Sequence, residues 1–140
     1  MIIYRVEHSI SNVGMFQSLS HRSILSDELY RVYRDEIYEV VMYIDNTPYQ
    51  EAVQCGKESE YLTLKQNINN IMFGCLTLEE LKEHWLPDFN NLINSLDKCG
   101  FVLAVYEVNH YVSLLTQVVF NKNYAKKQGE MSLRSLLELN

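Results

Sequence analysis

The sequence predicts an α+β fold in a single domain, residues 1–140, with a mixed or antiparallel sheet, a C-terminal β-hairpin and flanking helices. Three features predict this fold. The N-terminus is rich in β-branched and aromatic residues over 2–8, apolar residues recur at helical spacing over 27–44, and two apolar runs flank a turn within 101–120. A chain of 140 residues is long enough for one domain with a core and too short for two.

The first half of the chain begins with a strand over 2–8 and an irregular connection over 9–25, which is rich in Ser. Ser26 then opens a long amphipathic helix over 27–44, because a Ser side chain can cap the free amides and two acidic residues follow it. Thr47-Pro48 is a typical start for a further short helix.

Residues 53–72 are expected to form a loop with at most a short helix. Thr77 with Glu80 is a capping-box sequence, so a helix should follow over 78–86. A further helix is predicted over 88–98 and ends at Gly100.

The third part of the chain is predicted to form the middle of the sheet. Residues 101–108 and 111–120 are strongly apolar and are separated by Asn109-His110, which predicts a β-hairpin. Ser132 is placed to cap a short final helix over 133–139.

Composition narrows the class of protein. The hydrophobic fraction of 47% with only two prolines argues against disorder. No apolar run approaches the roughly 18–20 residues that span a bilayer, and the start does not have the pattern of a signal peptide. Three widely spaced cysteines and four isolated histidines suggest neither a disulfide framework nor a metal site. We therefore expect a soluble, cytoplasmic, metal-free protein.

The net charge of −6 is concentrated in one segment. Residues 26–60 contain nine acidic and three basic side chains. Direct nucleic-acid binding is not expected, since neutralising phosphates needs a basic surface. An acidic face suits a partner protein with a basic surface, or it serves only solubility.

The predicted helix 27–44 also carries four tyrosines, which cannot all face the core. Tyrosine among acidic residues is a plausible protein-binding surface, because tyrosine is enriched at binding hot spots. The alternative is a helix that only covers the sheet with bulky side chains. The candidate partner-binding residues are Tyr30, Asp35, Glu36, Tyr38, Glu39 and Asp45.

Four stretches carry a resemblance to a known group of proteins. They are the Tyr4-Arg5-x-Glu7-His8 start, the run FGCLTLEELKEHW from Phe73, GFVLAVYEV from Gly100 and QVVFNKNYA from Gln117. Together they resemble small proteins encoded by phages and prophages. The group has Cys-Gly-Phe where this chain has Phe-Gly-Cys, which leaves the role of Cys75 open.

The order of these signals is also similar to that of ADP-ribosyltransferases. The similarity implies NAD as cofactor, with Arg5 as the first-strand residue that holds it and His8 as the competing candidate. Thr77 would stand at the Ser-Thr-Ser step of that superfamily, and Gln117 at the position of the catalytic glutamate. A neutral amide replaces a charge-stabilising carboxylate poorly, so catalysis is not expected unless Glu107 or Glu79 takes its place.

Each of these residues has a simpler interpretation. Arg5 and Glu7 alternate with apolar residues and can lie on the solvent face of an edge strand. His8 can serve as a local hydrogen-bonding residue, Thr77 as a helix cap, and Gln117 as a partner for a backbone amide.

Two hypotheses remain from the sequence. The first is a non-catalytic phage accessory protein that binds a host protein with a basic surface, for instance in a defence or nucleic-acid-handling complex. The second is a small NAD-dependent ADP-ribosyltransferase. The sequence favours the binding protein and leaves its oligomeric state open.

Overall fold

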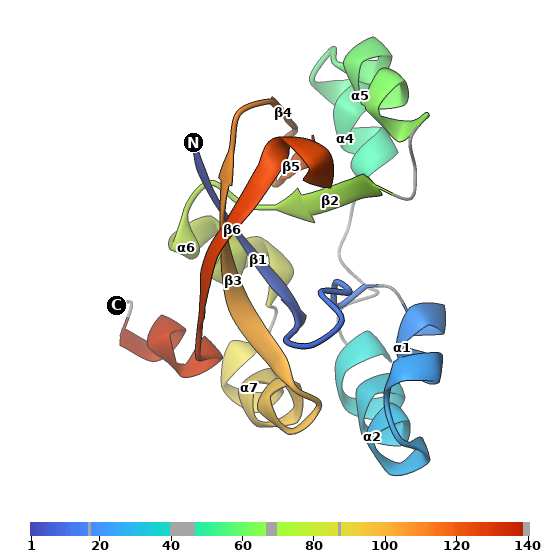
Figure 1. Cartoon of the computed structure of the whole chain (residues 1–140), viewed down its shortest axis with the longest axis vertical. Helices are drawn as coiled ribbons and strands as arrows, with labels where there is room; N and C mark the ends of the chain where they lie inside the picture. Colours follow the sequence, from blue (N-terminus) through green and yellow to red (C-terminus); the bar gives the residue numbers. More distant parts are fainter. Residues whose placement is uncertain (17, 40–46, 67–69, 87, 139–140) are drawn as a thin grey trace.

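A computed structural model describes residues 1–16, 18–39, 47–66, 70–86 and 88–138. It confirms the predicted α+β class. The described strands form two three-stranded antiparallel sheets, in the orders β1-β3-β6 and β2-β5-β4. Helices α4 and α5 lie at one end of the molecule beside the second sheet, and α1 and α2 lie at the other end (Figure 1).

The first sheet has the most apolar strand at its centre. That strand is β3 (Phe101–Val108), and it pairs along its whole length with β1 (Ile2–His8). On its other side it pairs with β6 (Ala125–Met131), with an irregularity in register between Val105 and Tyr106. The nearly continuous apolar sequence of β3 fits its side chains, which enter core clusters on both faces of the sheet.

The second sheet is smaller and is fastened to the first. It consists of β2 (Ile71–Gly74), β4 (Tyr111–Ser113) and β5 (Val118–Asn121). Directly after β2, the amide and carbonyl of Cys75 exchange two 2.8 Å hydrogen bonds with Tyr4 of β1. These bonds make β1 the strand on which the two sheets meet.

The predicted hairpin between 101–108 and 111–120 is wrong in its pairing. The strand β3 does not pair with β4, because β1 and β6 already occupy both of its edges. After Asn109-His110 the chain enters the second sheet instead, where β4 pairs with β5. The hairpin is therefore the shorter one that closes at Leu114–Gln117, where the Leu114 amide donates to the Gln117 carbonyl at 2.8 Å.

The long predicted helix is present as far as the structure describes it. It comprises α2 (Asp27–Val32) and the π-helical segment η1 (Tyr33–Tyr38), and the Ser26 hydroxyl accepts from the Leu29 amide as predicted. The rest of this prediction, residues 40–44, falls outside the described residues. The segment 9–25 is less irregular than predicted, since it contains helix α1 (Ser18–Ile24).

Helix α4 (Pro48–Gln54) begins at Thr47 with a complete capping box, as Thr47-Pro48 predicts. The segment 53–72, predicted to be a loop with a short helix, contains the eight-residue helix α5 (Glu58–Lys65) and the start of β2. The strand β6 is not predicted, because its residues are polar and lack a strong apolar period.

The later helices match the prediction closely. They are α6 (Leu78–Glu80), which continues into the π-helical segment η3 (Leu81–Trp85), and α7 (Phe89–Lys98). Gly100 follows α7 with a positive φ of 86°, as the helix end requires. Two 3₁₀ segments, η4 (Lys122–Tyr124) and η5 (Leu133–Glu138), complete the chain as described.

The core lies mainly on one face of the first sheet. Val6, Phe101 and Leu103 from that face pack with Tyr33 of η1 and with buried residues of η3 and α7. Trp85 is 4% exposed, as expected for a core residue. The opposite face carries Ile3, Ala104 and Tyr106 and turns toward the second sheet. None of the described helices is long and apolar enough to cross a bilayer.

Gly74 permits the close approach of the two sheets. A Cβ atom at this position would lie 2.5 Å from Ile3 Cγ2 and 2.7 Å from the Tyr4 carbonyl oxygen. We expect Gly74→Ala to lower the free energy of unfolding by about 1–3 kcal/mol, because the backbone must shift to relieve the overlap. Chemical denaturation measures this change.

Gly129→Ala is the matched control, since nothing lies within 4 Å of a Cβ atom there. That variant should unfold at nearly the wild-type denaturant concentration. Equal stabilities of the two variants would contradict the close packing at Gly74.

Candidate functional site

A fully buried carboxylate organises the face of the first sheet that turns toward the second sheet. Glu7 on β1 accepts hydrogen bonds from Arg5 Nε at 2.7 Å, from the Tyr106 hydroxyl at 2.8 and 3.0 Å, and from Lys127 Nζ at 2.9 Å. Arg5 and Glu7 are 4% and 0% exposed. The interpretation of both residues as solvent-facing is therefore wrong.

Strand geometry explains why these side chains meet. Alternate residues of a strand point to the same face, so Ile3, Arg5 and Glu7 share one face of β1. Tyr106 lies opposite Ile3 on the central strand, and Ala104 lies opposite Arg5. The small Ala104 side chain leaves room for the guanidinium to lie along the sheet.

The same network reaches beyond the first sheet. Arg5 Nη1 donates to the Phe73 carbonyl of β2 at 3.1 Å, and Arg5 Nη2 donates to the Asn12 carbonyl at 3.2 Å. Lys127 also contacts Asn12 Oδ1 at 3.0 Å and Glu130 at 2.6 Å. Asn12 has a positive φ of 61°, a conformation that few non-glycine residues adopt. Arg5 thus joins the loop after β1 to β2, and Lys127 joins the same loop to β6.

The electrostatics of the network favour a charged Lys127 and a neutral Tyr106. Desolvation lowers the pKa of Lys127, but hydrogen bonds to Glu130 and Glu7 outweigh it and the pKa is raised overall. Burial, together with the nearby Glu7 charge and hydrogen bond, raises the pKa of Tyr106 far above its usual value. Tyr106 is therefore a neutral donor to a carboxylate at physiological pH.

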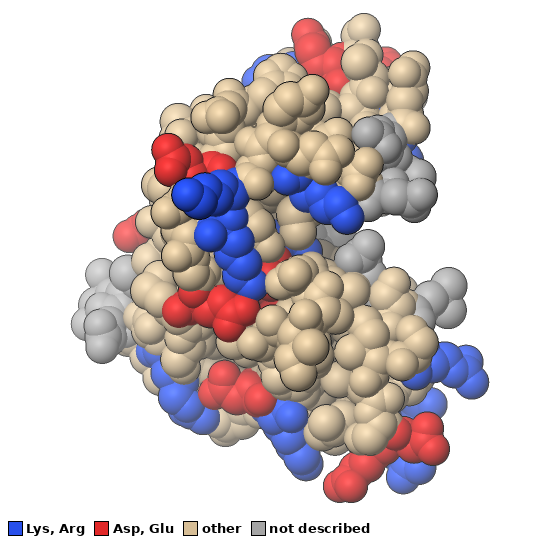
Figure 2. Space-filling view, viewed as in Figure 1, with Lys and Arg blue, Asp and Glu red and all other residues tan. Residues whose placement is uncertain are grey.

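A cleft lies beside this network, between β2, η4 and the loop after β1. Its volume is about 530 Å³. In Figure 2, Lys and Arg side chains lie along the upper border of a hollow in the right half of the molecule. The residues that line the cleft are Arg5, Ser11, Asn12, Val13, Ile71, Met72, Tyr106, Lys122, Asn123, Ala125 and Lys127.

The comparison with protein families identifies the relatives of this chain. The family model described as Bacteriophage T4 Y00F protein matches residues 1–134. The chain belongs to this family of phage proteins. The match extends from β1 through β6, so it includes every strand of both sheets described above. No curated protein and no solved structure matches the chain.

The residues predicted to form an NAD site do not line a common cleft in this Y00F-family protein. The cleft that Arg5 lines includes neither Thr77 nor Gln117. Thr77 is exposed and its hydroxyl accepts from the Glu80 amide at 3.0 Å, so it acts as a helix cap. The Gln117 side chain donates to Glu51 at 2.9 Å.

The other candidates for that site have local contacts of their own. His8 contacts the Ser11 hydroxyl at 3.1 Å and packs edge-on against Phe101, which agrees with a local hydrogen-bonding role. Glu107 is exposed and accepts from Gln128 at 3.2 Å. Glu79 is exposed on α6 and lines a different pocket. Neither carboxylate lines the cleft beside Arg5.

Sequence reasoning missed the carboxylate that holds Gln117. Glu51 of α4 is 1% exposed and accepts from the Thr116 amide at 2.6 Å, the Thr116 hydroxyl at 2.8 Å and Gln117. In the sequence, Glu51 is one of nine acidic residues in the segment 26–60, and nothing local distinguishes it from the others. Three donors compensate its burial, so Glu51 ties α4 to the β4-β5 turn.

The predicted partner-binding helix has a mixed character. Asp35, Glu36 and Glu39 are exposed, whereas Tyr30 and Tyr38 are half-buried on either side of the buried Tyr33. Both tyrosines pack against the core with part of the side chain exposed, which agrees with the prediction that the tyrosines of this helix cannot all face the core. Asp45 falls outside the described residues.

The charges on this helix are partly compensated. Residues 26–39 carry five acidic side chains and two arginines. Arg34 pairs with Asp35 at 2.8 Å, and Glu36 accepts from Ser95 at 3.1 Å. Acidic and basic side chains accordingly lie beside one another at the lower end of the molecule in Figure 2, where α1 and α2 lie in Figure 1.

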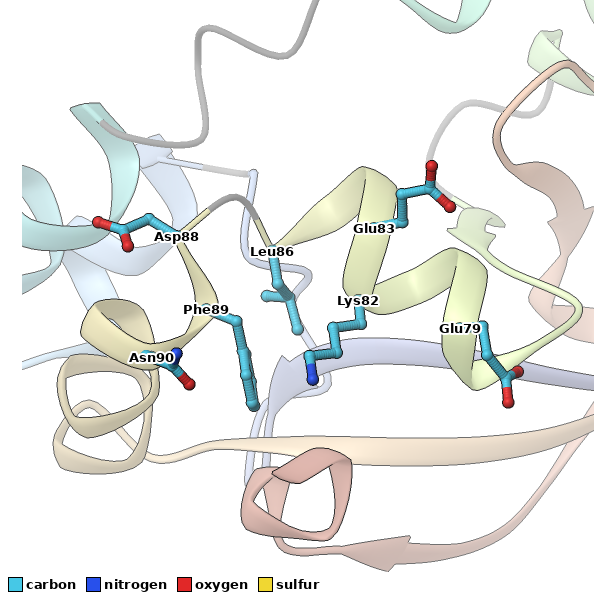
Figure 3. Close-up of a pocket in the computed structure, with 7 residues that line it drawn as sticks. All are labelled: Glu79, Lys82, Glu83, Leu86, Asp88, Phe89 and Asn90. Atoms are coloured by element: carbon cyan, nitrogen blue, oxygen red, sulfur yellow. The ribbon is translucent and has the colours of Figure 1, made fainter. Parts of the chain in front are cut away.

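A further pocket lies between η3 and the start of α7. In Figure 3, Lys82, Leu86 and Phe89 point toward one another, whereas Glu83 and Asp88 point away from them. The Lys82 ammonium lies 5.3 Å from the centre of the Phe89 ring. The acidic side chains do not converge on a common point, so the pocket has no arrangement for acid-base chemistry. Within the described residues, no group of three or more His, Cys, Asp or Glu side chains is placed to hold a metal ion.

The buried histidines make stability depend on pH. His21 is fully buried, contacts the Gly14 carbonyl at 2.7 Å and packs against Tyr33 and Phe101. Desolvation lowers the pKa of His21 despite the hydrogen bond to Gly14, and desolvation also lowers the pKa of His8. In the unfolded chain the pKa of each imidazole is about 6.5.

Below about pH 6.5 the unfolded state binds more protons than the folded state. The free energy of unfolding should therefore keep its full value above this pH and fall as the pH drops below it. We expect a lower melting temperature at pH 5.5 than at pH 7.5. His21→Phe, which keeps an aromatic ring in the core, should reduce this difference. A melting temperature that is equal at both pH values in the wild type would contradict the burial of neutral imidazoles.

Proposed function

We propose that this Y00F-family protein is a non-catalytic phage accessory protein that binds a host protein with a basic surface. The contact surface is the exposed acidic side of α2 and η1, with Asp35, Glu36 and Glu39 at its centre. The observation that carries the proposal is that these three carboxylates are exposed together on a helix that the buried Tyr33 fixes to the core. A rigid charged surface steers a partner of opposite charge and sets its orientation.

The packing beneath the helix supports this role. Tyr33 is fully buried and stacks on Phe101 at a centroid distance of 5.9 Å. Tyr30 and Tyr38 flank it and remain half-exposed at the edge of the acidic surface. Such tyrosines can add apolar contact area to a charged interface at low cost in conformational entropy. A basic host complex, such as one that handles nucleic acid or defends against phage, has the matching surface.

The alternative of an NAD-dependent ADP-ribosyltransferase has less support. The guanidinium of Arg5 already donates to Glu7, Phe73 and Asn12. The Gln117 amide donates to Glu51, and Thr77 caps a helix. These engagements favour structural roles for the three residues.

Charge reversal tests the proposed surface. The variant Asp35→Lys/Glu36→Lys/Glu39→Lys should lose partner capture, because it replaces attraction by repulsion toward a basic surface. Immobilised protein is incubated with lysate of the bacterial host, and captured proteins are identified by mass spectrometry. Circular dichroism confirms that each variant is folded.

The matched control is Glu60→Lys/Glu79→Lys/Glu83→Lys, which changes the net charge equally on exposed residues outside this helix. The control should retain the partner that the wild type captures. Retention of the same partner by the folded Asp35, Glu36 and Glu39 variant would remove the helix from the proposed interface.

A further inference from the structure

We propose that the cleft beside the Glu7 network binds a small phosphorylated molecule of about mononucleotide size. Three cationic side chains, Arg5, Lys122 and Lys127, line this cleft, and its lining contains no Asp or Glu. A cleft of about 530 Å³ lies within the range that small-molecule sites occupy. This site is separate from the acidic surface of α2 and η1.

The charges of the cleft are not equally available. Arg5 pairs with Glu7, and Lys127 pairs with Glu7 and Glu130, so these two cations are balanced by two carboxylates. Lys122 forms no ion pair with any residue that the structure describes. The cleft therefore has one uncompensated positive charge, that of the exposed Lys122.

The floor of the cleft is already ordered. Arg5 and Tyr106 are 4% and 5% exposed, and their positions are fixed by the hydrogen bonds to Glu7. Asn12 is held in its left-handed conformation by Arg5 and Lys127. The donors of Arg5 and Tyr106 are already used within the protein, so contacts to a phosphate come mainly from Lys122. The rigid floor gives the cleft a preformed shape, which reduces the entropic cost of binding.

The apolar part of the lining suits the rest of a nucleotide. Val13, Ile71, Met72 and Ala125 contribute apolar surface to the same cleft. An apolar wall beside cationic groups suits a molecule with a planar, weakly polar part and a phosphate. A polymeric nucleic acid fits less well, because the chain as a whole carries a net charge of −6.

Adenosine monophosphate is the probe, and adenosine is the control ligand that lacks the phosphate. Isothermal calorimetry with the full chain should show saturable binding of the monophosphate at millimolar concentration and none of adenosine. Lys122→Ala should weaken the binding by roughly tenfold or more, because it removes a charge-assisted contact to the phosphate. Lys122 is exposed, so the variant should remain folded.

Lys126→Ala is the matched control variant. Lys126 is the exposed neighbour of Lys127 on β6, does not line the cleft, and points to the opposite face of the sheet by strand alternation. It should bind the monophosphate as the wild type does. Absence of binding at 10 mM of the monophosphate, on the order of the weakest affinities that matter for a site of this kind, would overturn the proposal. Equal binding of adenosine, or equal losses in the Lys122 and Lys126 variants, would overturn it as well.

Discussion

A carboxylate that is removed from water must be matched by donors, because burying an unpaired charge costs several kcal/mol. Glu7 meets this condition with donors from all three strands of the first sheet: Arg5 on β1, Tyr106 on β3 and Lys127 on β6. Arg5 extends the connection to the Phe73 carbonyl of β2. The buried network thus links the second sheet to the first, together with the paired hydrogen bonds between Tyr4 and Cys75.

Other features of the chain follow from that arrangement. Gly74 is required where β2 approaches β1, and the paired hydrogen bonds between Tyr4 and Cys75 lie directly beside it. The cleft is lined by residues of both sheets, and Arg5, which lines it, also binds the Phe73 carbonyl of β2. The acidic helix lies on the other face, where Tyr33 joins it to the main core. The two proposed binding surfaces are thus carried by opposite faces of the first sheet.

The sequence predicted the elements that have a strong local signal. Ser26 and Thr77 cap the helices where expected, α7 ends before Gly100, and the strands over 2–8 and 101–108 are present. Pairing could not be predicted, because nothing local distinguishes a hairpin from two strands in different sheets. The strand β6 was missed because its residues are polar and exposed, yet it supplies Lys127. The burial of Glu7 could not be predicted either, because Tyr106 and Lys127, which bind its carboxylate, lie 99 and 120 residues further along the chain.

Amide hydrogen exchange in Glu7→Gln compared with the wild type tests the role of the network most directly. The substitution keeps the shape of the side chain and removes its charge, which leaves Arg5 buried without a counter-ion. The free energy of unfolding should fall by about 3–5 kcal/mol, as is typical when one partner of a buried ion pair is removed. The amides of Tyr4 and Cys75, which join the two sheets, should lose protection together. Unchanged protection of both amides in a variant of wild-type stability would contradict the dependence of the fold on Glu7.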